Sequence, residues 1–177
     1  MDYRNRQKRL LQSPEVARCD VFVVTHLPNV RYLCGFTGSS GVLLLSASGA
    51  VFFTDGRYTE QARAEVAGAR VKIVRKSALA AAAEWLRQQG SARSPVVAGI
   101  ESEHLSVAMR ALLSRSLSPR ARLRNTAGVV ERLRMGKDEE ELRRIRAAAR
   151  LGDQHRARAE IVPATGRWGA IAGAEAR

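Results

Sequence analysis

The feature that most constrains the fold of this chain is the stretch 29–58, a glycine-rich loop followed by two short apolar segments. Gly35, Gly38 and Gly41 stand three residues apart with hydroxyl side chains between them, and glycine permits the tight backbone paths of such loops. A phosphate-binding loop is the alternative interpretation, but it needs G-x-G-x-x-G or G-K-[ST] before a helix. An apolar segment follows Gly41 instead. We therefore interpret the loop as a structural connection into a sheet.

The two apolar segments, 42–46 and 50–54, predict a β-hairpin, because the Ala-Ser-Gly between them is a turn-forming sequence. The second segment ends in D-G-R-Y and leads into a predicted helix, 59–67. Aspartate is a strong helix N-cap, so we expect Asp55 to cap this corner. We expect Arg57 to pair with a nearby carboxylate or with backbone carbonyls. A surface that faces a partner is the alternative interpretation of the corner.

Two separated segments carry a family resemblance. Residues 29–41 read N-V-R-Y-L-C-G-F-T-G-S-S-G and residues 53–58 read F-T-D-G-R-Y. They resemble the N-terminal domain of the Xaa-Pro aminopeptidase, prolidase and creatinase family, whose usual form is N-x-x-Y-L-T-G-F-T-G-S-x-G and then D-G-R-Y. Cys34 replaces the usual threonine. Residues 129–148 are similar to the linker into that family's catalytic domain, so the resemblance covers about residues 10–150, an ordinary single-domain span.

The resemblance implies a creatinase N-terminal-like, three-layer α/β fold and a noncatalytic domain. Such a domain supports oligomerisation and borders the active site, often that of the neighbouring subunit. Carried over from the motifs, the candidate substrate- or interface-facing residues are Arg31, Tyr32, Phe36, Thr37, Asp55, Arg57 and Tyr58. A stand-alone peptide- or protein-binding module of the same fold, without peptidase activity, is the alternative function.

The resemblance also implies where metal chemistry belongs. A complete family member would hold two divalent ions, Mn, Co or Zn, in a pita-bread catalytic domain whose ligands are two aspartates, one histidine and two glutamates. Such ions activate a water molecule and polarise the scissile carbonyl. In this chain we expect no catalytic residue, no metal ligand and no cofactor, and hence no hydrolysis of Xaa-Pro peptides.

The end of the chain differs from the rest. We expect residues 1–126 to form the N-terminal domain, 127–154 to be a linker and the start of a truncated catalytic domain, and 155–177 to be an unmatched tail that is a candidate for disorder. The tail carries Pro163, several glycines and little amphipathic order. A truncated product, a frame-disrupted product and a domain left alone are the open alternatives.

Apolar periodicity predicts a mixed sheet of about six strands with helices on both faces. The expected strands are 20–25, 42–46, 50–54, 71–74, 96–100 and 121–124. The first expected helix is 3–18, broken or kinked near Pro14. A turn at 26–29 and one short helical turn within 30–36 follow. The further expected helices are 59–67, 78–89 between Ser77 and Gly90, 104–116, one capped by Asn125-Thr126 that runs through Met135, and one that opens at Asp138.

Several acidic and histidine side chains are candidates for catalysis or metal binding. Glu101 and Glu103 follow a buried strand, and a carboxylate pair suits acid–base catalysis or metal binding. Because acidic residues are also favoured at helix N-termini, we interpret both as the start of a helix. His26 lies in an expected turn, His104 begins an expected helix and His155 lies in the tail. A metal site needs several converging ligands, so none of the three is interpreted as a ligand.

The formal net charge of +13 raises nucleic-acid or anionic-membrane binding as a function. However, only four of the 30 basic residues are lysines, alanine is abundant, and the arginines are scattered without interleaved aromatics. That pattern is typical of a GC-rich coding sequence. We predict no specific nucleic-acid partner, no membrane partner, and a homo-oligomer formed through the N-terminal domain. With no signal peptide and no long apolar run, we expect a cytoplasmic protein in which Cys19 and Cys34 are reduced.

Overall fold

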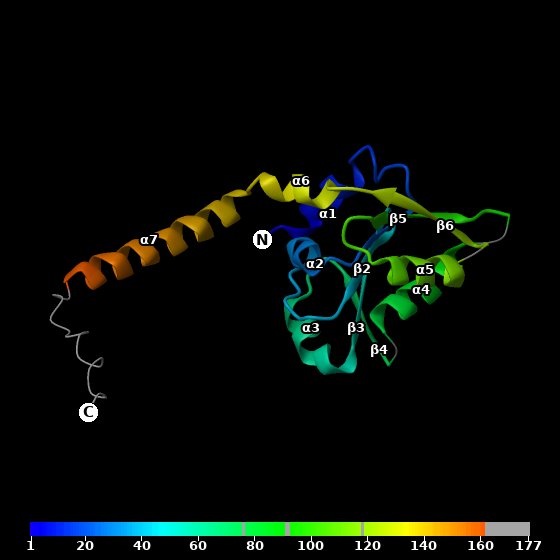
Figure 1. Ribbon diagram of the computed structural model, residues 1–177, viewed down its shortest axis with the longest axis horizontal. Helices are drawn as coiled ribbons and strands as arrows, with labels where there is room; N and C mark the ends of the chain where they lie inside the picture. Colours follow the sequence, from blue (N-terminus) through cyan, green and yellow to red (C-terminus); the bar gives the residue numbers. More distant parts are fainter. Residues whose placement is uncertain (76, 91–92, 118, 162–177) are drawn as a thin grey trace, which may run out of the picture. The chain divides into compact units, whose positions relative to one another are not determined.

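Six strands form one mixed sheet at the centre of the first of two units (Figure 1). The computed structural model describes the backbone of residues 1–161 except 76, 91, 92 and 118, and the side chains as far as Asp153. The chain divides into the units Met1–Gly136 and Lys137–Arg177.

The strand order is β4-β3-β2-β1-β5-β6. The strands are β1 (Val21–Val24), β2 (Val42–Ser46), β3 (Gly49–Asp55), β4 (Arg70–Val74), β5 (Val96–Glu101) and β6 (Ala121–Thr126). Strand β2 is antiparallel to β1 and to β3, and the pairs β3–β4, β1–β5 and β5–β6 are parallel. Five strands therefore end, and β2 begins, at one side of the sheet, which we call the carboxyl end of the sheet. The predicted mixed six-stranded sheet is confirmed.

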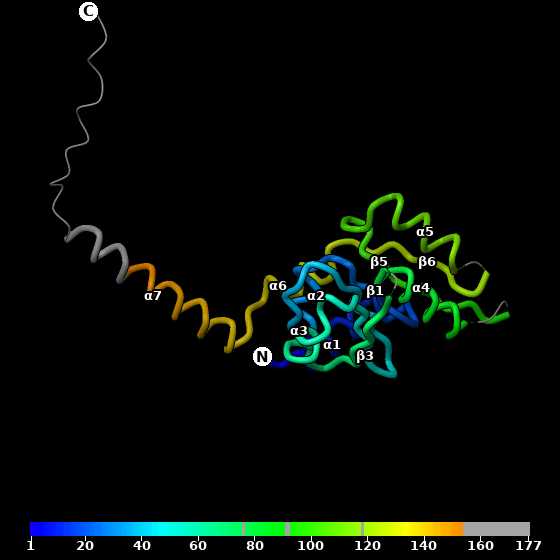
Figure 2. The backbone as a smooth tube through the Cα atoms, turned by 90° about the horizontal axis from the view of Figure 1, so that it is seen from below, coloured from blue at the N-terminus to red at the C-terminus, as the bar shows by residue number. Residues whose placement is uncertain are grey.

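Helices cover both faces of the sheet. One face carries α1 (Tyr3–Leu11), α2 (Leu27–Cys34), α3 (Thr59–Glu65) and α6 (Val129–Met135), and the other carries α4 (Ala78–Gln89) and α5 (Val107–Leu117). Figures 1 and 2 both show α1, α2 and α6 gathered together. The sequence of β1 is apolar throughout because the strand is buried on both faces. Phe22 and Val24 pack into one core, and Val21 and Val23 pack into the other.

The first helix is broken near Pro14, as expected, and residues 12–18 form turns instead of continuing it. The helix ends at Leu11 because Pro14 cannot continue a helix and the Ser13 hydroxyl donates back to the Leu10 carbonyl at 2.6 Å. The turn expected at 26–29 is wrong, since it is the beginning of α2. Proline is tolerated in the first helical turn, where its missing N–H has no partner anyway.

Two further expectations are wrong near the carboxyl end of the sheet. Strand β5 extends through Glu101 and α5 begins only at Val107, so neither Glu101 nor Glu103 starts a helix. Asn125 and Thr126 do not cap α6, because both belong to β6, where they pair with Ile100 and Glu101 of β5. The N-cap of α6 is Gly128. Strand pairing overrides the local capping preference in both places.

The second unit contains helix α7 (Glu139–Ile161). Its start is a capping box: the Asp138 carboxylate accepts from the Glu141 N–H at 2.8 Å, and the Glu141 carboxylate accepts from the Asp138 N–H at 3.1 Å. The tail expected from residue 155 is helical as far as Ile161, and the rest of it lies outside the described residues. Within the described part of the chain, no helix combines the length and the apolar character needed to cross a bilayer.

Candidate functional site

Two groups of polar side chains lie at the carboxyl end of the sheet. The loop–corner group consists of the loop Gly35–Gly41, the corner Asp55–Tyr58 and the α3 residues that bind the loop. The strand-end cluster consists of the side chains of His26, Asn29, Glu101, His104 and Glu131.

The glycines of the loop are required by aromatic rings beneath it. Phe36 is buried against Phe52 and Tyr58, with ring centroids 4.6 and 5.6 Å apart. A Cβ atom at Gly41 would lie 2.4 Å from the Phe52 ring, and one at Gly38 would lie 2.4 Å from the Phe36 ring. Such contacts are far inside van der Waals distance, so the sequence needs glycine for the backbone to pass over the rings.

The exposed part of the loop is held by side chains of the neighbouring helix. The N–H of Thr37 donates to Glu65 at 2.7 Å, and its hydroxyl donates to the same carboxylate at 2.8 Å. Gln61 donates to the Thr37 hydroxyl at 2.9 Å, and the Ser39 and Tyr58 hydroxyls are 2.6 Å apart. Burial acts to raise the pKa of Glu65, but the hydrogen bonds from Thr37 and Gln61 outweigh it and the pKa is lowered. The loop is thus ordered although it faces solvent.

The corner is held by one carboxylate, as the predicted cap requires. Asp55 precedes the 3₁₀ helix η1 (Gly56–Tyr58) and accepts from the Arg57 N–H at 3.1 Å. The Arg57 guanidinium donates to both Asp55 oxygens at 2.9 Å. This side-chain pairing lowers the pKa of Asp55 to about 2. The capping role of Asp55 and the carboxylate partner of Arg57 are confirmed, although the capped element is a 3₁₀ turn before α3.

The other two candidates carried over from the motif lie apart from this corner. Arg31 is exposed on α2. Tyr32 is buried: its hydroxyl donates to the Leu133 carbonyl at 3.3 Å, and the Arg6 guanidinium lies 4.3 Å from the centre of its ring. Tyr32 therefore ties α2 to α1 and α6, and Phe36 supports the loop from beneath, while Thr37 and Arg57 reach the surface.

The strand-end cluster is built around a buried carboxylate, Glu101. One of its oxygens accepts from the N–H groups of Thr25 and His26 at 2.7 and 2.9 Å, and the other accepts from the Asn29 amide at 2.7 Å. The same amide group donates to Glu131 at 2.6 Å. Asn29 thus joins the end of β5 to helix α6 through two carboxylates.

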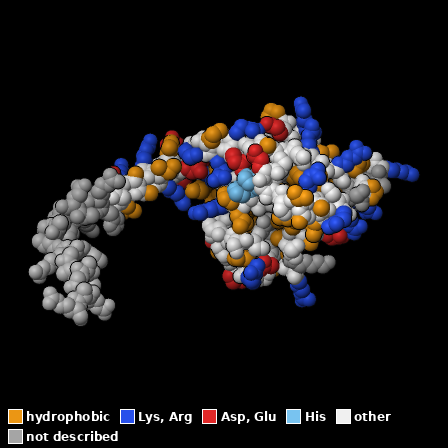
Figure 3. Space-filling model, viewed as in Figure 1, with side chains coloured by type: hydrophobic (Ala, Val, Ile, Leu, Met, Phe, Trp, Pro, Cys, Tyr) orange, Lys and Arg blue, Asp and Glu red, His pale blue; other side chains and the backbone are white. Residues whose placement is uncertain are grey.

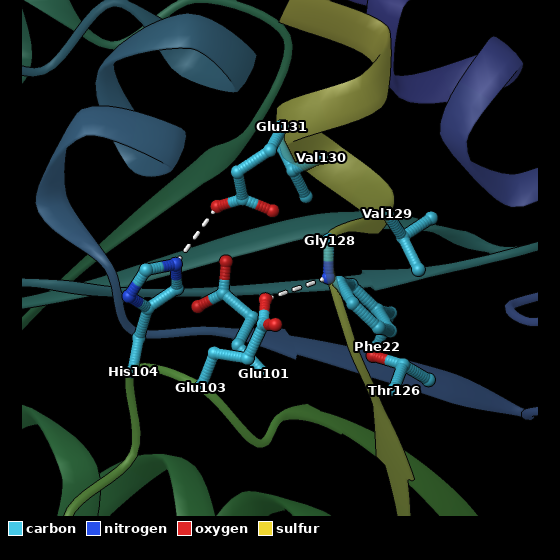
Figure 4. Close-up of a pocket in the computed structure, with 9 residues that line it drawn as sticks. All are labelled: Phe22, Glu101, Glu103, His104, Thr126, Gly128, Val129, Val130 and Glu131. Atoms are coloured by element: carbon cyan, nitrogen blue, oxygen red, sulfur yellow. Dashed lines mark hydrogen bonds and ion pairs between the residues drawn. The ribbon is translucent and has the colours of Figure 1, made fainter.

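Two histidines complete this cluster. The rings of His26 and His104 are stacked, with centroids 3.7 Å apart and planes 8° from parallel. The Nε2 atom of His104 lies 2.9 Å from Glu131 (Figure 4). Burial and the neighbouring His104 lower the pKa of His26. Burial acts to raise the pKa of Glu131, but bonds from Asn29 and His104 outweigh it and lower the pKa.

One ligand atom from each of His26, His104 and Glu131 falls within 4.8 Å of the others, so these three side chains could hold a metal ion. Figure 3 shows the histidine side chains beside acidic side chains on the face in view. A small hollow adjoins them and is lined by Phe22, Glu101, Glu103, His104, Thr126, Gly128, Val129, Val130 and Glu131 (Figure 4).

Sequence reasoning missed this cluster as a group, because it judged His26, Glu101 and His104 one at a time. The available signal was that parallel strands place polar residues after β1 and β5 at the same end of a sheet, where open α/β sheets bind ligands. Glu131 gave no such signal, since it belongs to a helix far along the chain.

Comparisons with known proteins agree with the fold. The family model described as the creatinase/prolidase N-terminal domain matches residues 6–136. The uncharacterized peptidase YqhT of Bacillus subtilis is 35% identical over 134 residues, which are 76% of this chain and 36% of that protein.

Solved structures give the same result. An Xaa-Pro dipeptidase from Bacillus anthracis has a TM-score of 0.71 and 26% identity, covering 80% of this chain and 38% of that chain. The N-terminal domain of the cytoplasmic peptidase PepQ from Mycobacterium tuberculosis has a TM-score of 0.62 and 32% identity, covering 73% of this chain and 98% of that chain. The chain thus spans little more than a third of the full-length relatives, at their N-terminal domain. It belongs to the creatinase/prolidase N-terminal domain family.

Proposed function

We propose that the unit Met1–Gly136 is the noncatalytic N-terminal domain of an Xaa-Pro aminopeptidase or prolidase-like dimetal peptidase. The observation that carries this proposal is the family match over residues 6–136, which spans almost the whole unit. The Bacillus anthracis relative is described as an Xaa-Pro dipeptidase, which supports a proline-directed peptidase as the parent enzyme. The two divalent ions and the hydrolysis belong to a further domain of that enzyme, and this unit contributes a surface.

The surface we assign to this role is the loop–corner group together with Arg31. It forms a homo-oligomer contact and borders the active site of the neighbouring subunit. Support comes from its combination of exposure and order: Thr37 is held by Glu65, and the exposed Arg57 guanidinium is held by Asp55. A surface that is ordered before binding loses little conformational entropy when a partner docks.

A measurement of oligomeric state tests this assignment. We expect light scattering after gel filtration to show a concentration-dependent homodimer. Arg57→Glu should raise the dissociation constant of this dimer by about tenfold or more, because it reverses a charge at the contact. Arg63→Glu is the matched control, since Arg63 is an exposed arginine of α3 that pairs with Glu60 of the same helix at 3.0 Å. A wild-type protein that stays monomeric at high concentration contradicts the oligomer role, as does equal weakening by both variants.

A second measurement concerns activity and the alternative function. We expect the 177-residue chain not to hydrolyse Xaa-Pro dipeptides or longer Xaa-Pro peptides with added Mn²⁺. Turnover that disappears on chelation contradicts the noncatalytic assignment. A stoichiometric partner other than a second copy, captured at physiological salt, supports the stand-alone binding module instead.

The description of the Mycobacterium tuberculosis relative as cytoplasmic supports the same compartment for this protein.

A further inference from the structure

We propose that His26, His104 and Glu131 bind one divalent d-block ion, of which Zn²⁺ is the type, at the carboxyl end of the sheet. This site is separate from the two-ion centre of the parent enzyme and does not depend on the proposed function. It departs from the expectation that this chain contains no metal ligand. The three side chains offer two imidazole nitrogens and one carboxylate oxygen within 4.8 Å of one another.

The donor set selects the class of ion. Imidazole suits Zn, Co, Ni and Cu, whereas Mg²⁺ and Ca²⁺ prefer sites built from oxygen alone. Two histidines and one glutamate form a known zinc ligand set, in which water takes the fourth position. The chain carries a net charge of +13, yet Glu101 and Glu103 lie beside Glu131 around this hollow (Figure 4). Their negative charge favours a cation locally, against the opposing charge of Arg134, which donates to Asn29.

The distance between the ligand atoms of His104 and Glu131 suits the binding of one ion by both. Two ligand atoms that each lie about 2.05 Å from one ion are about 2.9 Å apart at a right angle and about 3.4 Å apart at the tetrahedral angle. The Nε2 atom of His104 and the Oε1 atom of Glu131 are 2.9 Å apart. An ion can therefore replace the proton between them once the His104 ring turns so that its nitrogen lone pair points at the ion. Asn29 orients the Glu131 carboxylate through a hydrogen bond of 2.6 Å, the type of outer contact that fixes metal ligands.

The stacked rings of His26 and His104 must separate before both can bind the same ion. Parallel imidazoles 3.7 Å apart cannot both direct an in-plane nitrogen lone pair at one ion. His104 is the ring that can turn, because it lies in the turn between β5 and α5 and its side chain is 27% exposed. His26 is held more firmly, since its own N–H donates to the buried Glu101. We therefore expect metal binding to unstack the pair by a rotation of His104.

The bound ion would join three parts of the unit that are distant in sequence. His26 immediately precedes α2, His104 follows β5 and Glu131 belongs to α6. One ion coordinated by all three would hold the helix α6 against the end of the sheet. The role that follows is structural, because a ligand that binds the folded state alone stabilises it.

The test uses tag-free, metal-stripped protein at neutral pH. Co²⁺ is titrated by its visible absorption and Zn²⁺ by calorimetry, for the wild type and for His26→Ala, His104→Ala and Glu131→Gln. Two matched controls are His155→Ala, which removes the histidine of the second unit, and Glu84→Gln, which removes an exposed carboxylate of α4 on the other face of the sheet. All proteins carry Cys19→Ser, because Cys19 is a partly exposed free thiol that could bind the same ions.

We expect one equivalent of ion to bind the wild type and each control. Each ligand variant should weaken binding by about tenfold or more, since even outer-shell changes commonly cost that much. Histidine ring signals in NMR should show His26 and His104 losing their mutual stacking as the ion is added. No saturable binding, or binding that both histidine variants keep, overturns the proposal, as does an equal loss in His155→Ala. If His26→Ala fails to fold without metal, His104→Ala still decides, because its side chain is partly exposed.

Discussion

Glu101→Gln tests whether a buried carboxylate holds the carboxyl end of the sheet together. Glu101 is 5% exposed and accepts from two backbone N–H groups and from the Asn29 amide. Glutamine retains one acceptor oxygen for the N–H groups of Thr25 and His26. Its amide nitrogen then faces the Asn29 amide nitrogen, so two donors meet. Rotating the Asn29 amide does not relieve this, because its oxygen accepts from Arg134 at 2.9 Å.

The magnitude follows from the bonds that are lost. A hydrogen bond to a charged group contributes about 1.5–3 kcal/mol, and a buried donor left without an acceptor costs about 1–3 kcal/mol. These two costs overlap, so Glu101→Gln should lower the free energy of unfolding by about 2–3 kcal/mol. Glu101→Ala, which leaves all three donors without their acceptor, should lower it by about 4 kcal/mol or more. A domain of this size is stable by about 5–15 kcal/mol, so the alanine variant approaches unfolding.

Urea unfolding followed by circular dichroism measures both losses. With an m-value of about 2 kcal/mol/M, Glu101→Gln should lower the midpoint by about 1–1.5 M without changing the slope. Glu103→Gln is the control, since Glu103 is exposed and accepts from one N–H, that of Gly128, at 2.9 Å. It should cost no more than about 1 kcal/mol. A Glu101→Gln midpoint within about 0.25 M of the wild type refutes the reasoning, because it leaves no room for a lost buried bond.

Two further predictions concern titrating groups. The Asp55 carboxyl should titrate in NMR with a pKa near 2, and Arg57→Gln should return it toward its ordinary value of 3.8, because the guanidinium causes the shift. Because folding lowers this pKa, the stability that the Asp55–Arg57 pair contributes is present above about pH 4 and is lost as the pH falls toward 2. An Asp55 pKa that is unchanged in the variant contradicts the pairing. Burial raises the pKa of the Cys34 thiol to about 11. A thiol reagent near pH 8 should therefore modify the partly exposed Cys19 first and Cys34 only on unfolding. Equal modification rates of the two cysteines in the folded protein contradict this prediction.

Local patterns predicted those elements whose determinants are adjacent in sequence. The hairpin of β2 and β3 follows from two apolar runs around a turn: β2 has the predicted limits, and β3 is one residue longer at each end. Helix α4 has the predicted bounds because Ser77 caps it, accepting from the Ala80 N–H at 3.2 Å, and Gly90 follows its last residue. The cap at Asp55 was predictable for the same reason, since its partner is two residues away.

Predictions failed where distant strands supply the bonding partners. Asn125 and Thr126 have the composition of a helix cap, but six residue pairs with β5 place them in a strand instead. Glu101 resembles the acidic start of a helix, yet its donors belong to Thr25, His26 and Asn29, more than 70 residues earlier. Local sequence patterns do not specify such pairings, because hydrogen bonds between residues so far apart in sequence depend on which strands lie side by side.

The sequence by itself determined the α/β class, the approximate limits of six strands, the cap at the corner and the family, since each depends on short-range patterns or on a continuous motif. The tertiary structure alone decided the strand order, the burial of Glu101 and the meeting of His26, His104 and Glu131. The physical reason is the direction of the strands. Because β1 and β5 are parallel, the residues that follow them reach the same end of the sheet, where helix α6 supplies the third side chain.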